Sequence, residues 1–378
     1  KIIDFKKNNL HLVSYSEPID EILSYKELNK NLYSIEEKPN AIPYVTSYYK
    51  KRWGFCLNHK TRKKLKKDEK YTIYINSSFK KKGSLSIGEI YIKGKVRQEI
   101  ILSTNICHPS MVNNELCAPV ILSFISKYFK NKNNYFSIRI LFLPETVGCI
   151  TYLKENLKKL KRNFRAGYHV SCFGDKGKFS IVSTKYENSY SDYIAKKVLK
   201  NYGKFKTYPF KYCGSDERQY NFPGIDIPIA TLTKTKFGIY KEYHTSLDNL
   251  KITNPSTLKK SFNLIRDLVK EIKKDKKKIV KNNSVINNKF IQKDHKNRKY
   301  NQKVYSLTKC EPFLSKRNLY RDLSKDLLTN NELIMFNILY YGDGIKITDI
   351  SKLLNEKDFK VLSIAKLLEK NDLIKLKY

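Results

Sequence analysis

Four short segments of the sequence contain the residue types that bind divalent metals or move protons. They are CHPSMVNNELCAP (107–119), LPETVG (143–148), CGSDERQY (213–220) and EYHTSLDN (242–249). Imidazole and carboxylate groups are the ligands that catalytic zinc prefers, and such sites keep one position open for a water whose pKa falls to about 7. A carboxylate beside that water can take its proton and pass it to a leaving amine. The four segments therefore predict a metal-dependent hydrolytic site.

The elements around these segments alternate apolar runs with amphipathic stretches from about Gln98 to Asn249, as a mostly parallel sheet flanked by helices requires. Buried strands are expected at 99–104, 137–145, 167–174, 178–184 and 227–233. Helices are expected at 119–129, 148–157, 190–202 and 256–273. Strands 99–104 and 137–145 end immediately before polar segments, and α/β folds place their chemistry at the carboxyl ends of strands.

The chain is too long for one compact core, and its remaining parts indicate further units. Short alternating runs with Pro39 and Pro43 indicate a small β-rich module, and three helix candidates before a terminal strand resemble a winged helix. The chain opens like the middle of a domain, so we expect that an N-terminal segment precedes it. The expected division is 1–31 for the start of the α/β domain, 32–92 for the inserted module, 93–273 for the rest of the α/β domain, 274–301 for a basic linker and 302–378 for the winged-helix domain.

Composition limits the expected partners and the compartment. Lys plus Arg outnumber Asp plus Glu by 75 to 36, but the excess is spread along the chain and predicts only weak, non-specific polyanion binding. The seven cysteines are scattered without a CxxC pair, which is typical of a reducing compartment. No run of about 18 apolar residues occurs. We expect a cytoplasmic protein without a membrane span, and we leave a homo-oligomer open.

The four segments and their neighbours resemble a known family. The strings that carry the likeness are AIPYVTSYYKKRWGFCL, ICHPSMVNNELCAP, LPETVG, CGSDERQYNFPGIDIP and EYHTSLDN. The chain resembles a bacterial aminopeptidase-like family that is often associated with polysaccharide biosynthesis and has an inserted β-rich domain and a C-terminal winged helix. That family is related to the co-catalytic zinc aminopeptidases. The resemblance implies an α/β fold with a zinc-aminopeptidase-like mixed sheet flanked by helices.

Carried over residue by residue, the resemblance implies that His108, Asp216 and His244 bind the metal and that Glu145 is the general base. Where the family usually has NDN, this chain has Asn113, Asn114 and Glu115, so an amide replaces the bridging aspartate. Thr146 replaces the second Glu of the two-zinc peptidases. Because amide and hydroxyl oxygens are weaker ligands than carboxylates, we expect one zinc ion, with Asn114 as a weaker additional ligand.

Neighbouring residues suggest supporting roles. Asp248 is expected to accept a hydrogen bond from an imidazole N–H, and Glu217 and Arg218 are expected to bind substrate. Glu115 is an alternative ligand that would substitute for Asn114, and His169 is expected to be a core histidine within a strand.

The leading functional expectation is an amide-bond hydrolase of aminopeptidase type that acts on a peptide or an N-acyl amino sugar. Two alternatives stay open. One is a non-catalytic ligand-binding or scaffold descendant, because Asn114 and Thr146 weaken the metal site. The other is a nucleic-acid-binding regulator, although its last helix has Lys360 and Lys366 but no Arg or Gln to contact base edges.

Overall fold

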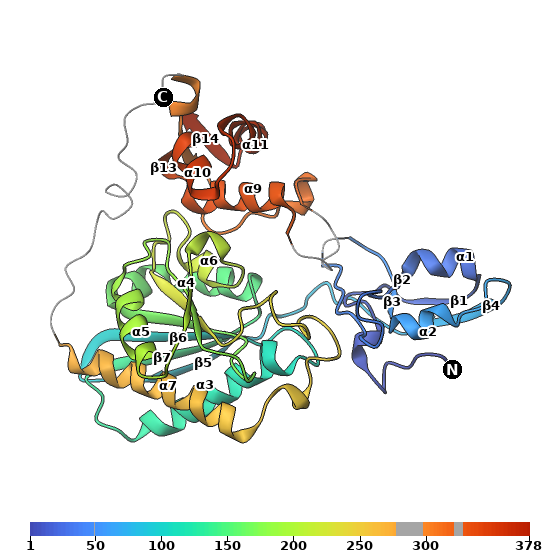
Figure 1. The fold of residues 1–378 in the computed structure, drawn as a ribbon, viewed down its shortest axis with the longest axis horizontal. Coiled ribbons are helices and arrows are strands. Elements are labelled where there is room, and N and C mark those ends of the chain that lie inside the picture. The colour runs from blue at the N-terminus through green and yellow to red at the C-terminus, as the bar shows by residue number, and fades with distance from the viewer. Residues whose placement is uncertain (49, 277–297, 321–327) are drawn as a thin grey trace.

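The computed structural model describes residues 1–48, 50–276, 298–320 and 328–378. Figure 1 shows three regions: a sheet domain flanked by helices, a small module that contains the N-terminal residues, and a C-terminal domain beside the sheet domain. Most of the expected linker 274–301 lies outside the described residues. Within the described ranges, none of the helices combines the length and apolar character needed to cross a membrane.

The sheet domain is built on seven strands in the order β10-β9-β11-β8-β6-β7-β5. Its centre, β11-β8-β6-β7, is parallel, whereas β9 and β5 run antiparallel to β11 and β7, so the sheet is mixed as expected. The strands are β5 (Gly88–Ile92), β6 (Val96–Asn105), β7 (Phe136–Leu143), β8 (Phe164–Val170), β9 (Ser180–Val182), β10 (Lys206–Tyr208) and β11 (Ile229–Thr233). The apolar runs in β6 and β7 follow from burial on both faces.

Helices cover both faces of this sheet. The helices α3 (Cys117–Lys130), α5 (Tyr190–Lys200) and α7 (Pro255–Lys274) contribute to one apolar core. The helices α4 (Val147–Asn163) and α6 (Glu217–Tyr220) contribute to the core on the other face. The expected helices of the sheet domain are therefore confirmed, and α6 is an addition directly after Asp216.

The bounds of the small module differ from those expected. It contains β1 (Ile19–Ser24), α1 (Tyr25–Leu28), β2 (Leu32–Tyr33), β3 (Phe55–Cys56), α2 (His59–Lys63) and β4 (Lys70–Ile75). Because β1 pairs with β4, residues 19–31 belong to this module and not to the start of the α/β domain. Because β5 pairs with β7, residues 88–92 belong to the main sheet and not to the module. Alternating hydrophobicity indicates a strand but not its partner, which explains both corrections.

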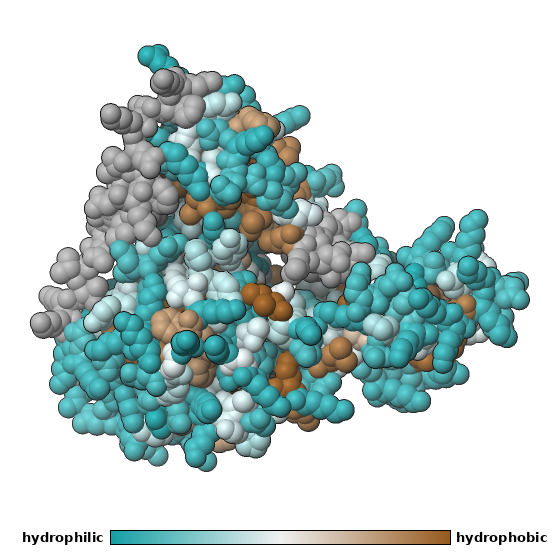
Figure 2. Space-filling view, viewed as in Figure 1, coloured by the Kyte–Doolittle hydropathy of each residue, from teal (hydrophilic) through white to brown (hydrophobic). Residues whose placement is uncertain are grey.

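In the C-terminal domain, residues 298–320 and 328–378 form the helices α9 (Asn330–Tyr341), α10 (Ile347–Leu354) and α11 (Asp358–Lys370) on a sheet of order β13-β12-β14. Its strands are β12 (Lys303–Ser306), β13 (Asp343–Lys346) and β14 (Ile374–Lys377). Tyr340 and Tyr341 of α9 share one apolar core with Phe210 and Phe222 of the sheet domain. The face seen in Figure 2 is largely hydrophilic, with apolar atoms visible where these two domains meet. The C-terminal domain is thus packed onto the sheet domain.

Candidate metal and catalytic site

His108 and Glu145 follow the ends of two neighbouring parallel strands. Asn105 at the end of β6 pairs with Leu143 at the end of β7, so the residues that follow both strands emerge side by side. His108 Nε2 lies 3.9 Å from Glu145 Oε2. The structure therefore brings a predicted metal ligand next to the predicted general base.

His244 reaches the same place from the loop after β11. The rings of His108 and His244 are 5.0 Å apart, and Tyr44 of the small module lies 5.0 Å and 5.3 Å from them. The Tyr44 N–H donates to the His244 carbonyl at 2.8 Å, and Tyr243 stacks on the His244 ring at 3.9 Å. Burial and the neighbouring His108 lower the pKa of His244 well below its ordinary value, so this ring is neutral and able to bind a metal.

The second ring nitrogen of His108 faces a carboxylate. His108 Nδ1 is 2.7 Å from Glu115 Oε1 and 3.2 Å from Cys107 Sγ. Burial is the largest single influence on the pKa of His108 and would lower it, but the charge of Glu115 and the hydrogen bonds to Cys107 and Glu115 together raise that pKa well above its ordinary value. Glu115 itself is only 5% exposed. The carboxylate next to the imidazole is therefore Glu115, a position that the sequence suggested only as a substitute ligand.

Asn114 lies in a π-helical turn, Val112–Leu116, that opens α3. Its N–H donates to Asp248 Oδ2 at 3.1 Å, and the N–H of Asn113 donates to Asp248 Oδ1 at 2.6 Å. Asp248 also accepts from Tyr240 at 2.9 Å. This corrects the expected role of Asp248, because its partners are this turn and Tyr240 rather than an imidazole.

Asp216 contacts the loop that carries Glu145. Its Oδ1 accepts from the Thr146 N–H at 2.8 Å, and Thr146 has a φ of 61°, an uncommon conformation for a β-branched residue. Burial raises the pKa of the Asp216 carboxyl well above its ordinary value, and Glu145 raises it further. Asp216 therefore supports the conformation of the Glu145–Thr146 loop.

Arg218 joins this loop to the C-terminal domain. It donates to Thr146 Oγ1 at 2.6 Å, to the Ser215 carbonyl at 3.1 Å and to Glu311 Oε2 at 2.7 Å. The same Glu311 oxygen accepts from Gln219 at 3.3 Å and from Tyr340 at 3.0 Å. A residue of the C-terminal part therefore holds the guanidinium close to Glu145, whose Oε1 is 3.9 Å from Arg218 Nη1.

Glu217 does not match its expected role in binding substrate. Its side chain is fully buried, Oε1 accepts from the N–H groups of Gly214 and Ser215, and Oε2 accepts from Thr231 at 2.8 Å. These bonds fix the loop before α6 and account for three acceptor positions of a carboxylate that is fully buried. Arg218 as a substrate contact stays a prediction.

The sequence did not indicate one group that contacts Glu145, the predicted general base. Ser215 Oγ lies 3.0 Å from Glu145 Oε1 and 2.9 Å from His169 Nε2, and it accepts from Asn105 at 3.0 Å. His169 is fully buried in β8, as expected of a core histidine, but it contacts Glu145 through Ser215. The Gly-Ser that precedes Asp216 was the signal, and only the fold shows that Ser215 reaches Glu145.

Several atoms of the predicted metal ligands are buried without a hydrogen-bond partner. Among the described residues, these include Asn114 Oδ1, Asp216 Oδ2 and His244 Nε2. Buried polar atoms are rarely left unbonded, so these atoms suit a bound cation. In the same described part, Cys107, His108 and Glu115 form a group whose possible metal-binding atoms all lie within 4.8 Å of one another. Asp216 and His244 do not belong to this group. Ligation by Asp216 stays a prediction.

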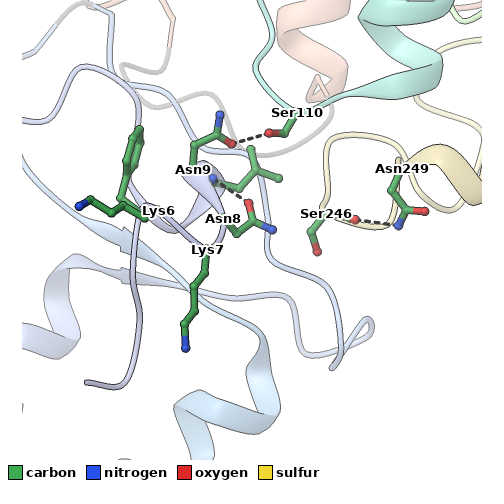
Figure 3. Close-up of a pocket in the computed structure, with 9 residues that line it drawn as sticks. Lys6, Lys7, Asn8, Asn9, Ser110, Ser246 and Asn249 are labelled. Carbon is green, nitrogen blue, oxygen red and sulfur yellow. Dashed lines mark hydrogen bonds between the residues drawn. The ribbon is translucent and has the colours of Figure 1, made fainter.

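A polar pocket of about 390 Å³ lies beside the two histidine loops. Figure 3 shows that Asn8 and Asn9 of the small module face Ser110, which follows His108, and Ser246, which follows His244. The Ser110 hydroxyl donates to Asn9 Oδ1 at 2.5 Å. This volume lies within the range of about 300–1,000 Å³ that is usual for ligand pockets.

Comparisons with known proteins agree with this architecture. Residues 20–275 match the family described as Domain of unknown function (DUF4910), and residues 302–376 match a winged helix-turn-helix model. A Clostridium acetobutylicum protein, whose name refers to polysaccharide biosynthesis and an aminopeptidase-like domain, is 36% identical over 346 residues, which are 91% of this chain and 73% of that protein.

Solved structures also resemble the fold. A crystal structure from Clostridium acetobutylicum, named as a candidate peptidase, has a TM-score of 0.70 and 34% identity over 100% of this chain and 80% of that chain. A zinc aminopeptidase from Bacillus subtilis has a TM-score of 0.52 and 15% identity over 68% of this chain and 69% of that chain, which shows a shared fold.

The mixed sheet with its helices and these likenesses define an aminopeptidase-like α/β protein with a C-terminal winged helix. The chain belongs to the DUF4910 family, and the expected family resemblance is confirmed.

Proposed function

We propose that the chain is a metal-dependent amide-bond hydrolase of aminopeptidase type that uses one zinc ion. The observation that carries the proposal is the position of Glu145 beside His108, whose ring lies 5.0 Å from that of His244. Asn114 and His244 each have a buried polar atom without a hydrogen-bond partner. Hydrolysis by an activated water requires ligands that can bind a metal ion and a carboxylate next to them that can accept a proton.

The ion would be held by His108 and His244 through Nε2 and by Asn114 through Oδ1, with Asp216 as a further predicted ligand. Two imidazoles and one or two oxygens match the nitrogen and oxygen ligands of catalytic zinc. His244 is already neutral, whereas His108, whose pKa is raised, would give up its Nε2 proton when the ion binds. When bound, zinc would supply an acidified water and polarise the substrate carbonyl.

The side chains of the chain then have separate tasks. Glu145 takes a proton from the water and returns it to the leaving amine. Ser215 donates to Glu145 Oε1 at 3.0 Å, which orients the carboxylate with Oε2 toward His108. Tyr44 packs against both imidazoles and excludes water from that side of the rings.

The substrate is a peptide or an N-acyl amino sugar. The polar pocket beside Ser110 and Ser246 offers amide and hydroxyl groups that suit either substrate. The acyl-sugar alternative rests on the name of the Clostridium acetobutylicum relative, which is an association and not a physical argument. Arg218 is the candidate contact for a substrate carboxylate because its guanidinium can bind such a group with two hydrogen bonds.

Elemental analysis of protein purified without added metal, combined with hydrolysis assays, tests this proposal. We expect about one zinc per chain, and we expect Glu145→Gln to keep the metal but lose about 10²–10⁴-fold in rate on any amide substrate found. Glu155→Gln, an exposed change on α4 with the same change in charge, is the control. Hydrolysis by Glu145→Gln at the parent rate would refute the role of Glu145.

A non-catalytic binding protein is the second candidate, and it is favoured by Asn114 and Thr146 at positions where the resemblance leads us to expect carboxylates. The Asn114→Asp variant separates the two candidates. Metal in this variant but none in the parent would favour the binding protein. Nucleic-acid binding by the winged helix, weak polyanion binding, a homo-oligomer and a cytoplasmic location stay predictions.

A further inference from the structure

Glu115 is the carboxylate that contacts His108, and it is held firmly in place. Its Oε1 lies 2.7 Å from His108 Nδ1 and accepts from Asn114 Nδ2 at 3.2 Å. Its Oε2 accepts from the Cys107 N–H at 3.2 Å. The side chains of Glu115 and His108 are only 6% and 8% exposed, so water competes little for these bonds.

The contact decides which ring nitrogen of His108 is available. A neutral imidazole that donates its Nδ1–H to a carboxylate has its lone pair on Nε2, so the proton that His108 releases when it binds a metal leaves from Nε2. That Nε2 atom points toward Glu145, at 3.9 Å from its Oε2. Carboxylates in this position orient a metal-binding histidine, fix its tautomer and raise its basicity.

We propose that Glu115 is a positioning residue that holds His108 with Nε2 directed to the metal, rather than a metal ligand itself. The proposal rests on the proposed metal-dependent function. It also replaces the role that the sequence suggested for Glu115, which was that of a substitute ligand.

The competing interpretation is that Glu115 binds the metal itself, together with its neighbours. Cys107, His108 and Glu115 have ligand atoms within 4.8 Å of one another and would form a metal site through Nδ1. Two observations favour the positioning role. Nδ1 already contacts Glu115 and Cys107 at hydrogen-bonding distance, and a site at Nδ1 would leave Asn114 Oδ1 and His244 Nε2 buried without a partner.

The first experiment uses the full chain with ¹⁵N-labelled histidine, loaded with ¹¹³Cd. We expect cadmium to couple to Nε2 of His108 while Nδ1 keeps its proton, with the signals assigned through His108→Gln. Coupling to Nδ1 would overturn the proposal. Cobalt loading is a second readout, because a sulfur-to-cobalt charge-transfer band would identify Cys107 as a ligand and overturn it as well.

The second experiment measures zinc affinity by competition with a chelator. We expect Glu115→Gln to weaken binding about 10–100-fold, Glu115→Asp to recover part of this loss and Glu155→Gln to bind like the parent. If the parent binds zinc and Glu115→Gln binds it equally well, only the role of Glu115 is wrong. If the parent binds neither zinc nor cadmium, the proposed function fails together with this inference. Should Glu115→Gln not fold, the cadmium spectrum of the parent still decides.

Discussion

Glu145 contacts two groups of polar side chains. The groups differ in whether all of their buried polar atoms have hydrogen-bond partners. We call His108, Asn114, Glu115 and His244 the imidazole cluster, and Thr146, Glu217, Arg218, Gln219 and Glu311 the guanidinium cluster. Among the described residues, the imidazole cluster has buried atoms without a partner on Asn114 and His244, whereas the guanidinium cluster has none.

This difference indicates different tasks for the two clusters. An unsatisfied buried polar group costs about 1–3 kcal/mol, so a fold that keeps several of them at one place gives up stability there. A bound ion would recover that stability by occupying the free atoms. The guanidinium cluster instead resembles a completed scaffold that joins the Glu145 loop to the C-terminal domain through Arg218 and Glu311.

Removal of Arg218 should have the largest effect on stability. Arg218→Met leaves Glu311 without its cation, and breaking a buried ion pair costs about 3–5 kcal/mol, which the partial exposure of Glu311 reduces to roughly 3 kcal/mol. Urea unfolding measures this change. The control is Arg266→Met, whose pair with Asp267 is more exposed. Equal losses in both variants would show that the guanidinium cluster is not a scaffold.

Zinc should stabilise the chain through the imidazole cluster. At a zinc concentration of 100 times the Kd, ligand binding raises the free energy of unfolding by about 2.7 kcal/mol. Thermal unfolding with and without zinc should show this rise in the parent and in His59→Ala, a histidine of the small module. The rise should be lost in His244→Ala. Equal stabilisation of His244→Ala would place the ion elsewhere.

The Glu217→Gln variant should lose about 2 kcal/mol, because its carboxylate accepts two backbone N–H groups and a hydroxyl in a buried loop. Zinc affinity should not change, since the buried carboxylate bonds the loop before α6 and Thr231. Chemical denaturation and zinc competition measure the two effects. A large loss of zinc affinity without a loss of stability would mean that Glu217 acts at the metal.

The smallest effect is expected for Tyr340→Phe. This change removes one hydrogen bond to Glu311 and keeps the ring packed on Phe210, so the expected loss is about 1 kcal/mol. Adding Tyr340→Phe to Arg218→Met in a double-mutant cycle measures whether the two contacts to Glu311 depend on each other. Strict additivity would argue against one connected cluster.

The sheet domain was predictable because its strands are buried on both faces and its helices have one apolar face each. Continuous apolar runs predict β6 and β7, and helical spacing of apolar residues predicts α3, α5 and α7. The strands β1 and β5 were assigned to the wrong units because strand pairing depends on partners distant in the sequence. The short elements β10, α6 and β12 were missed because three or four residues establish no period.

By itself, the sequence determined which functional groups are present: imidazoles at His108 and His244, a carboxylate at Glu145, and the amide of Asn114 where the resemblance leads us to expect an aspartate. The type of each side chain is set by the sequence alone. Only the tertiary structure decided the pairings, with Glu115 against His108, Asp248 against the backbone of the Asn113–Asn114 turn, Ser215 against Glu145 and Glu311 against Arg218. Apart from Glu115, these partners are 70 to 135 residues apart, so packing of the sheet and both domains brings them together. Glu115 is close to His108 in sequence, but only the π-helical turn directs its carboxylate to the ring.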